Sequence, residues 1–92
     1  MTKEFTMTEN NIPPRPPHSY RITLTLNSRK DRMDNVLLEA LHNQTENITL
    51  KNLSRTALKA LFKDGKILIK GQRATQSSAL AKGTTYVDIL GF

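Results

Sequence analysis

Residues 54–71 read SRTALKALFKDGKILIKG, and this stretch contains the signals that decide the fold. Ser54 is a favoured N-cap residue, so we predict that a helix begins there and runs to about Asp64. The next residue, Gly65, is the type that most often ends a helix in the left-handed conformation. Three apolar residues recur at helical spacing and are predicted to form the buried face of this helix: Leu58, Leu61 and Phe62.

Short strands and tight turns are predicted after this helix. The last strand should direct Val87 and Ile89 inward, because apolar and polar residues alternate along it. The expected elements are a strand at 66–70, a turn at Gly71-Gln72, a return strand at 73–75, a turn at Lys82-Gly83 and a last strand at 85–90.

Upstream of the same stretch, the sequence predicts one strand and one further helix. From Tyr20 to Leu26 apolar and polar residues alternate, which is the pattern of a half-buried strand. We expect Asp31 to cap the helix that follows and Asp34 to lie in its first turn, where the helix dipole favours a negative charge. Its apolar stripe consists of Met33, Val36, Leu37, Ala40 and Leu41.

The connection between the two helices is predicted to be a loop. Residues 42–52 are polar and irregular, and only Ile48 and Leu50 are expected to turn back onto the core. The predicted order is therefore strand, helix, helix and three strands. This order is typical of an α+β fold in which two helices pack on a small, mostly antiparallel sheet.

The first 19 residues are predicted to be a flexible tail, which leaves residues 20–92 as the single domain. The tail is rich in Thr, Asn and Pro, and Pro13-Pro14-Arg15-Pro16-Pro17 favours an extended polyproline helix. We favour a semi-rigid spacer for this segment. Its two overlapping P-x-x-P spacings would also suit a partner with an aromatic groove.

The net charge of +6 is concentrated in one quarter of the chain. The segment from Lys51 to Arg73 has one acidic residue, Asp64, and the rest of the chain is neutral. A positive charge localised in this way attracts a polyanion. The alternative is that these residues form a solvated face that only aids solubility. The seven basic residues of this segment are Lys51, Arg55, Lys59, Lys63, Lys66, Lys70 and Arg73.

The spacing of these cations favours the polyanion. Arg55, Lys59 and Lys63 recur every four residues and should line one face of the second helix. Like charges at this spacing destabilise an isolated helix, and phosphate groups would turn the repulsion into attraction. Lys66 and Lys70 are expected to share one face of the hairpin.

Signals for catalysis and for cofactor binding are missing from the sequence. It has no Cys, and His18 and His42 have no spacing typical of metal ligands. No glycine-rich phosphate loop follows a strand. We therefore expect a non-enzyme without metal or cofactor. We also expect it to lie in the cytoplasm, because no apolar run suggests a signal peptide or a membrane span, and we favour a monomer.

With the elements placed, residues 32–90 resemble the S-four RNA-binding domain, also called the alpha-L motif, which is named after ribosomal small-subunit protein four. Residues 32–37, RMDNVL, are similar to the R-L-D-x-x-L opening of that family's first helix. Residues 54–71 resemble its S-R-x-x-A-x-x-L-I-x-x-G-x-V-x-V-N-G core. Residues 77–83, SSALAKG, resemble its P-S-x-x-L-x-x-G-D segment.

The resemblance implies an RNA-contacting face on the second helix and the hairpin, with Arg32 as a further basic position. This chain departs from the family pattern at Lys70, where Asn is usual, and at Thr84, where Asp is usual, and its loop between the helices is longer. Carried over, the face consists of Arg55, Lys59, Lys63, Lys66, Lys70 and Arg73.

Two functional hypotheses follow, in addition to a pocket for a small anion such as a nucleotide. The first is a non-catalytic protein that binds structured RNA, ribosomal or transfer RNA, with the ribosome as a candidate partner. The second is a protein-interaction adaptor that uses the basic face or the Pro-rich tail.

Overall fold

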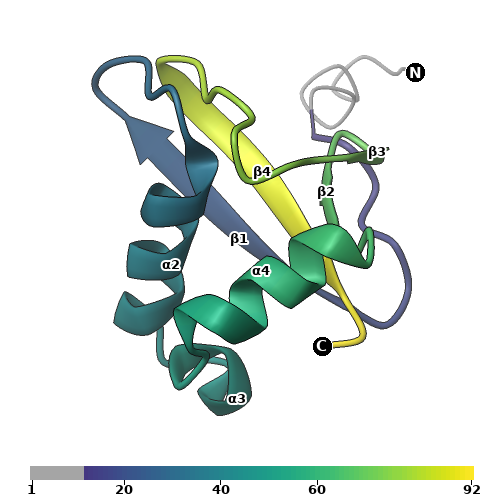
Figure 1. Ribbon diagram of the computed structural model, residues 1–92. Helices are drawn as coiled ribbons and strands as arrows, with labels where there is room; N and C mark the ends of the chain where they lie inside the picture. The colour runs from purple at the N-terminus through teal and green to yellow at the C-terminus, as the bar shows by residue number, and fades with distance from the viewer. Residues whose placement is uncertain (1–11) are drawn as a thin grey trace, which may run out of the picture.

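The computed structural model describes residues 12–92 and shows a four-stranded sheet with helices packed on one face (Figure 1). The strands lie in the order β1-β4-β2-β3, and each neighbouring pair is antiparallel. The predicted α+β class is confirmed. In chain order the elements are β1 Ser19–Leu26, α2 Met33–Asn43, α3 Ile48–Lys51, α4 Arg55–Lys63, β2 Ile67–Ile69, β3 Gln72–Arg73 and β4 Gly83–Leu90.

The β2–β3 hairpin turns at Lys70-Gly71, one residue earlier than predicted. Ile69 pairs with Gln72, which leaves a two-residue turn with φ 54° at Lys70 and 76° at Gly71. Two positive φ angles are the mark of a type I′ turn, whose twist matches that of the adjoining strands. Lys70 therefore lies in the turn, and the prediction that it shares a sheet face with Lys66 is wrong.

The predicted cap of α2 by Asp31 is also wrong. The N-cap residue is Arg32, and its side chain makes no capping hydrogen bond. Asp31 lies one position further upstream and pairs with Arg29 instead. The predicted place of Asp34 in the first turn of α2 is confirmed.

A short helix, α3, occupies part of the predicted loop between the two long helices. Asn47 begins it, because its side-chain oxygen accepts a hydrogen bond from the Leu50 N–H at 3.0 Å. Gln44 braces this start by donating to the Asn47 carbonyl at 2.7 Å. Leu50 is fully buried as predicted, whereas Ile48 is 60% exposed and does not join the core.

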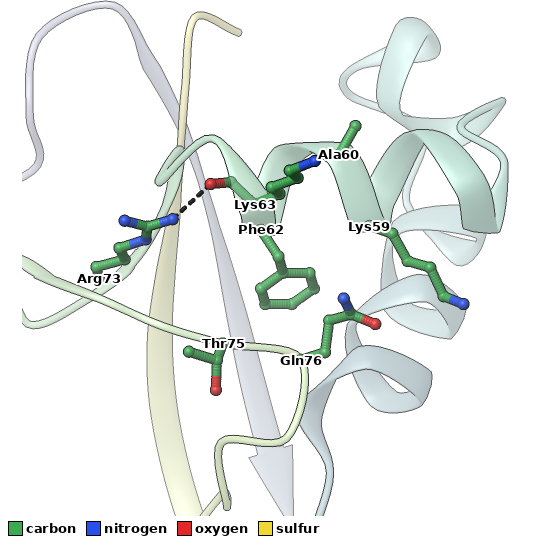
Figure 2. A pocket seen from close by; sticks show the side chains of 7 residues that line it. All are labelled: Lys59, Ala60, Phe62, Lys63, Arg73, Thr75 and Gln76. Atoms are coloured by element: carbon green, nitrogen blue, oxygen red, sulfur yellow. Dashed lines mark hydrogen bonds between the residues drawn. The ribbon is translucent and has the colours of Figure 1, made fainter.

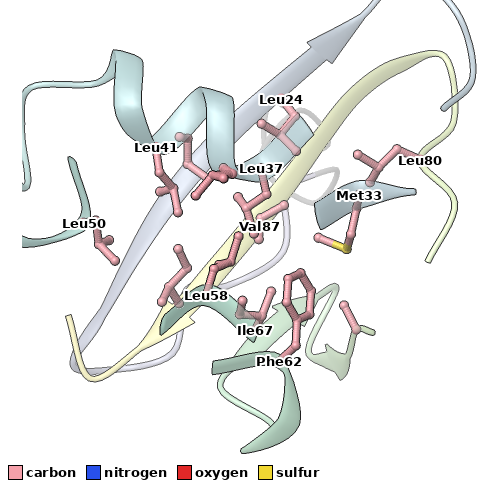
Figure 3. Close-up of a cluster of buried hydrophobic side chains, with 14 residues drawn as sticks. Leu24, Met33, Leu37, Leu41, Leu50, Leu58, Phe62, Ile67, Leu80 and Val87 are labelled. Carbon is pink, nitrogen blue, oxygen red and sulfur yellow. The ribbon is translucent and has the colours of Figure 1, made fainter. Parts of the chain in front are cut away.

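The core lies between the sheet and its helices (Figure 3). Ile22 and Leu24 of β1 and Val87 and Ile89 of β4 are buried, as the alternation predicted. Leu61 is only partly buried, so α4 buries two of its three predicted apolar residues. The helices contribute Met33, Leu37, Leu38, Leu41, Leu50, Leu58 and Phe62.

The predicted tail lies partly outside the described residues, since residues 1–11 are not described. Of the remainder, the Pro13 carbonyl accepts a hydrogen bond from the Arg21 guanidinium at 2.6 Å, and the Pro16 carbonyl accepts one from the Ser19 hydroxyl at 2.5 Å. Arg21 also donates two hydrogen bonds to the buried carboxylate of Asp88, at 2.7 and 2.9 Å. These bonds join residues 13–16 to the sheet.

Within residues 12–92, no helix combines the length and the apolar character needed to cross a membrane.

Candidate nucleic-acid interface

Helix α4 places apolar and cationic side chains on different faces. Ser54 Oγ accepts a hydrogen bond from the Ala57 N–H at 3.0 Å, so the predicted N-cap is confirmed. Leu58 and Phe62 are buried in the core. The exposed side carries a row of cations spaced four residues apart, as predicted: Arg55, Lys59 and Lys63.

Two cations of this row border a surface hollow of about 440 Å³, which we call the α4 hollow (Figure 2). It lies between α4 and the loop after β3. Arg73 of β3 completes its cationic rim, and the Arg73 guanidinium donates to the backbone carbonyl of Lys63. That carbonyl is at the C-terminal end of α4, where the helix dipole favours a cation. The residues that line the hollow are Lys59, Ala60, Phe62, Lys63, Arg73, Thr75 and Gln76.

A second hollow, of about 600 Å³, lies along the edge of β4 beside the hairpin and includes Lys70 and Arg73. It exists because β2 pairs with β4 only at residues 87–89, so residues 84–86 have no strand neighbour on that side. Arg73 lines both hollows and thereby connects Lys70 with the cations of α4. We call these cations, together with Arg55 at the start of the α4 row, the basic band: Arg55, Lys59, Lys63, Lys70 and Arg73.

At the other end of the band, Arg55 contacts the first turn of α2. Its guanidinium donates to the side-chain oxygen of Asn35 at 2.7 Å. The neighbouring Arg32 donates to the buried carboxylate of Asp34 at 3.1 Å, so Arg32 shares its charge with an acid. The Arg32 hydrogen bond holds the pKa of Asp34 below its ordinary value, the Asn35 N–H and the Arg55 charge act in the same direction, and burial opposes them.

Besides Arg32, two predicted site residues lie outside this band, Lys51 and Lys66. Lys51 ends α3 and donates to the backbone carbonyl of His42 at 2.7 Å, at the C-terminal end of α2. Lys66 is exposed between Gly65 and β2 and borders neither hollow. The structure thus gathers five of the seven clustered cations and directs Lys51 elsewhere.

No carboxylate forms an ion pair with the basic band within residues 12–92, although the Arg55 charge acts on Asp34. The ion pairs there are Arg21–Asp88, Arg29–Asp31 and Arg32–Asp34. None of the seven cations between residues 51 and 73 takes part in one. The positive charge on this surface is therefore available to an external anion.

The charge pattern of the sequence did not indicate three polar side chains beside the band. Thr75 and Gln76 line the α4 hollow, and Asn35 holds Arg55. They are uncharged and outside any periodic pattern, so only the tertiary structure reveals them. In the described part of the chain, no group of three or more His, Asp or Glu side chains could hold a metal ion.

Comparison with models of known protein families, with curated proteins and with solved structures finds no match.

Proposed function

We propose that this protein is a non-catalytic RNA-binding protein that docks its basic band on the phosphates of structured RNA, ribosomal or transfer RNA. One observation carries the proposal: cations from α4, the hairpin turn and β3 border two adjoining hollows with no carboxylate paired to them. A band of this kind matches a chain of phosphates.

The aromatic residues favour recognition of RNA shape over stacking on single strands. Phe62 is only 3% exposed. The Tyr20 hydroxyl is held by Glu46 at 3.0 Å, and the Tyr86 ring lies 5.4 Å beneath the Arg21 guanidinium. Proteins that bind single strands stack bases on several exposed aromatic rings. These three rings are covered or engaged, and in the described chain Phe92, 36% exposed, is a single exposed aromatic at the C-terminal end of the sequence. Backbone contacts to a folded RNA are the alternative that remains.

The resemblance to the S-four RNA-binding domain supports the same target, since that family's RNA-contacting positions fall on the second helix and the hairpin. Arg55, Lys59 and Lys63 match the helix positions, and Lys70 and Arg73 match the hairpin. Ribosomal and transfer RNA as targets would place the protein in the cytoplasm, with the ribosome as a candidate partner.

A double charge reversal tests the proposal. Lys59→Glu with Lys63→Glu changes two exposed side chains that form no hydrogen bond through their ammonium groups within residues 12–92, so the fold should survive. The matched control is Lys30→Glu with Lys82→Glu, which changes the net charge equally at exposed positions outside both hollows.

Binding of a transfer RNA and a ribosomal RNA fragment should be measured across a salt series. We expect the α4 variant to lower the log–log salt slope by about one unit per lysine and to bind far more weakly at low salt. The control should bind nearly as the original protein does. Equal loss in both variants, or no loss in either, would exclude the basic band as the interface.

A second candidate is a protein-interaction adaptor, favoured by the exposure of alternate prolines. Pro14 and Pro17 are exposed, whereas Pro13 and Pro16 are partly buried. Residues three apart share one face of a polyproline helix, so one P-x-x-P pair faces outward beside the exposed Arg15. Changing Pro14 and Pro17 to Ala should leave RNA binding intact. If the protein bound no RNA but bound a protein partner, and these two substitutions abolished that binding, the adaptor role would be preferred.

A further inference from the structure

We infer that the α4 hollow receives a single unpaired nucleotide of the bound RNA and recognises its base through Gln76. This inference rests on the RNA-binding function proposed above and deepens it, because it names the feature of the RNA that the protein would prefer.

The hollow combines the two environments that a nucleotide needs. Its lining is mostly apolar, with the Phe62 ring turned toward the loop of Thr75 and Gln76, and Lys59, Lys63 and Arg73 border it (Figure 2). Its volume, about 440 Å³, lies within the range of clefts that hold small ligands. A duplex docked only through its phosphates requires a basic surface and no such recess.

Gln76 supplies a group that can read a base. Its side-chain amide forms no hydrogen bond within residues 12–92, although the residue is partly buried against the hollow. The Gln76 backbone is anchored beside α2, because the Asp34 N–H donates to the Gln76 carbonyl at 3.3 Å. A glutamine amide presents one donor and one acceptor side by side, the combination that pairs with an adenine edge.

The recognised nucleotide must be unpaired. In a duplex the pairing edge of a base is occupied by its partner, and the deep groove of an RNA helix is closed to side chains. A bulged or looped nucleotide can leave the stack and present its edge. Since Phe62 is only 3% exposed, its ring belongs to the core and gives the base no stacking platform. Selectivity should therefore depend on the Gln76 amide.

Two RNA hairpins with the same stem test the inference, one fully paired and one carrying a single bulged adenosine. We expect the original protein to bind the bulged hairpin about tenfold more tightly, the effect of one good bidentate contact. Gln76→Ala should abolish this preference. It should leave the affinity for the paired hairpin and the salt slope unchanged, because an amide neutralises no phosphate.

The variant should fold, since the Gln76 backbone that anchors the loop is retained, and thermal unfolding would verify this. Asn43→Ala is the matched control, because it removes an exposed amide at the end of α2, outside both hollows, and should keep the preference. Equal binding of the two hairpins by the original protein, or a preference that survives Gln76→Ala, would overturn the inference alone. Failure to bind either hairpin would overturn the RNA-binding function and the inference with it.

Discussion

Replacing Lys70 by Asn should make the protein more stable and weaken its binding to RNA. Lys70 occupies the first position of a type I′ turn at φ 54°. The left-handed conformation costs a residue other than Gly about 1–2 kcal/mol, and Asn tolerates it better than most. Asn followed by Gly71 is also the preferred pair for this turn type. The lysine is therefore a poor choice for folding.

The size of each effect can be worked out from this geometry. If Asn removes about half of the strain, the free energy of unfolding rises by about 0.5–1 kcal/mol. For a domain of this size, that change raises the melting temperature by about 2–8 °C. The loss of one cation beside Arg73 should lower the log–log salt slope of RNA binding by about 0.7–0.9 and the affinity severalfold.

Thermal unfolding and a salt series of RNA-binding measurements would check both effects. Lys70→Ala is the control that separates them, since it removes the charge without relieving the strain: it should lose RNA affinity to the same extent and gain no stability. Equal stability of the Asn and Ala variants would refute the claim of strain. Unchanged RNA affinity in both would refute the placement of Lys70 in the interface.

Three further substitutions test the fold around the interface. Asp34→Asn should lower the melting temperature at pH 7, and its difference from the original protein should shrink below about pH 4. The reason is that Arg32 lowers the pKa of Asp34 in the folded state. The stability that the Asp34 carboxylate contributes is therefore present above its pKa in the unfolded chain and is lost as the pH falls through its pKa in the folded protein. Arg21→Met should destabilise the fold by about 3–5 kcal/mol in urea unfolding, because it leaves the buried Asp88 carboxylate without its partner, and adding Asp88→Leu should restore much of the loss. Ser54→Ala removes the N-cap of α4 and should cost about 1 kcal/mol by the same measurement, with the helix otherwise retained; no change would mean that the cap is dispensable.

Periodicity predicted the long elements of the fold well. The alternation along β1 and the apolar stripe of α2 each extend over enough residues to distinguish a strand from a helix. Helix α3 was missed because four residues are about one turn, too short for a repeat to be visible. Its formation depends on Gln44 and Asn47 bonding to each other, a contact that no single-residue propensity expresses.

The charges of the candidate site were predictable, but their destinations were not. Counting located the cations, and helical spacing correctly aligned Arg55, Lys59 and Lys63. Lys51 was counted with the same cationic face, yet α3 and α4 are separate helices, and Lys51 donates to the His42 carbonyl in α2. Gln76 was invisible for a related reason, since its place in the α4 hollow results from a loop packing against a distant helix.

The arrangement of charge across the molecule favours the proposed role in binding a polyanion over a role in solubility alone. Away from the band, three arginines of the described chain pair with acids, Arg21, Arg29 and Arg32, whereas lysines such as Lys30 and Lys82 stand singly and exposed. On α4 it places like charges four residues apart, which costs about 0.2–0.5 kcal/mol per pair, and it adds a strained lysine at Lys70. Solubility requires neither penalty, because dispersed charges would serve it equally well. An anion bound across the band would offset the repulsion and make use of the lysine that the turn disfavours.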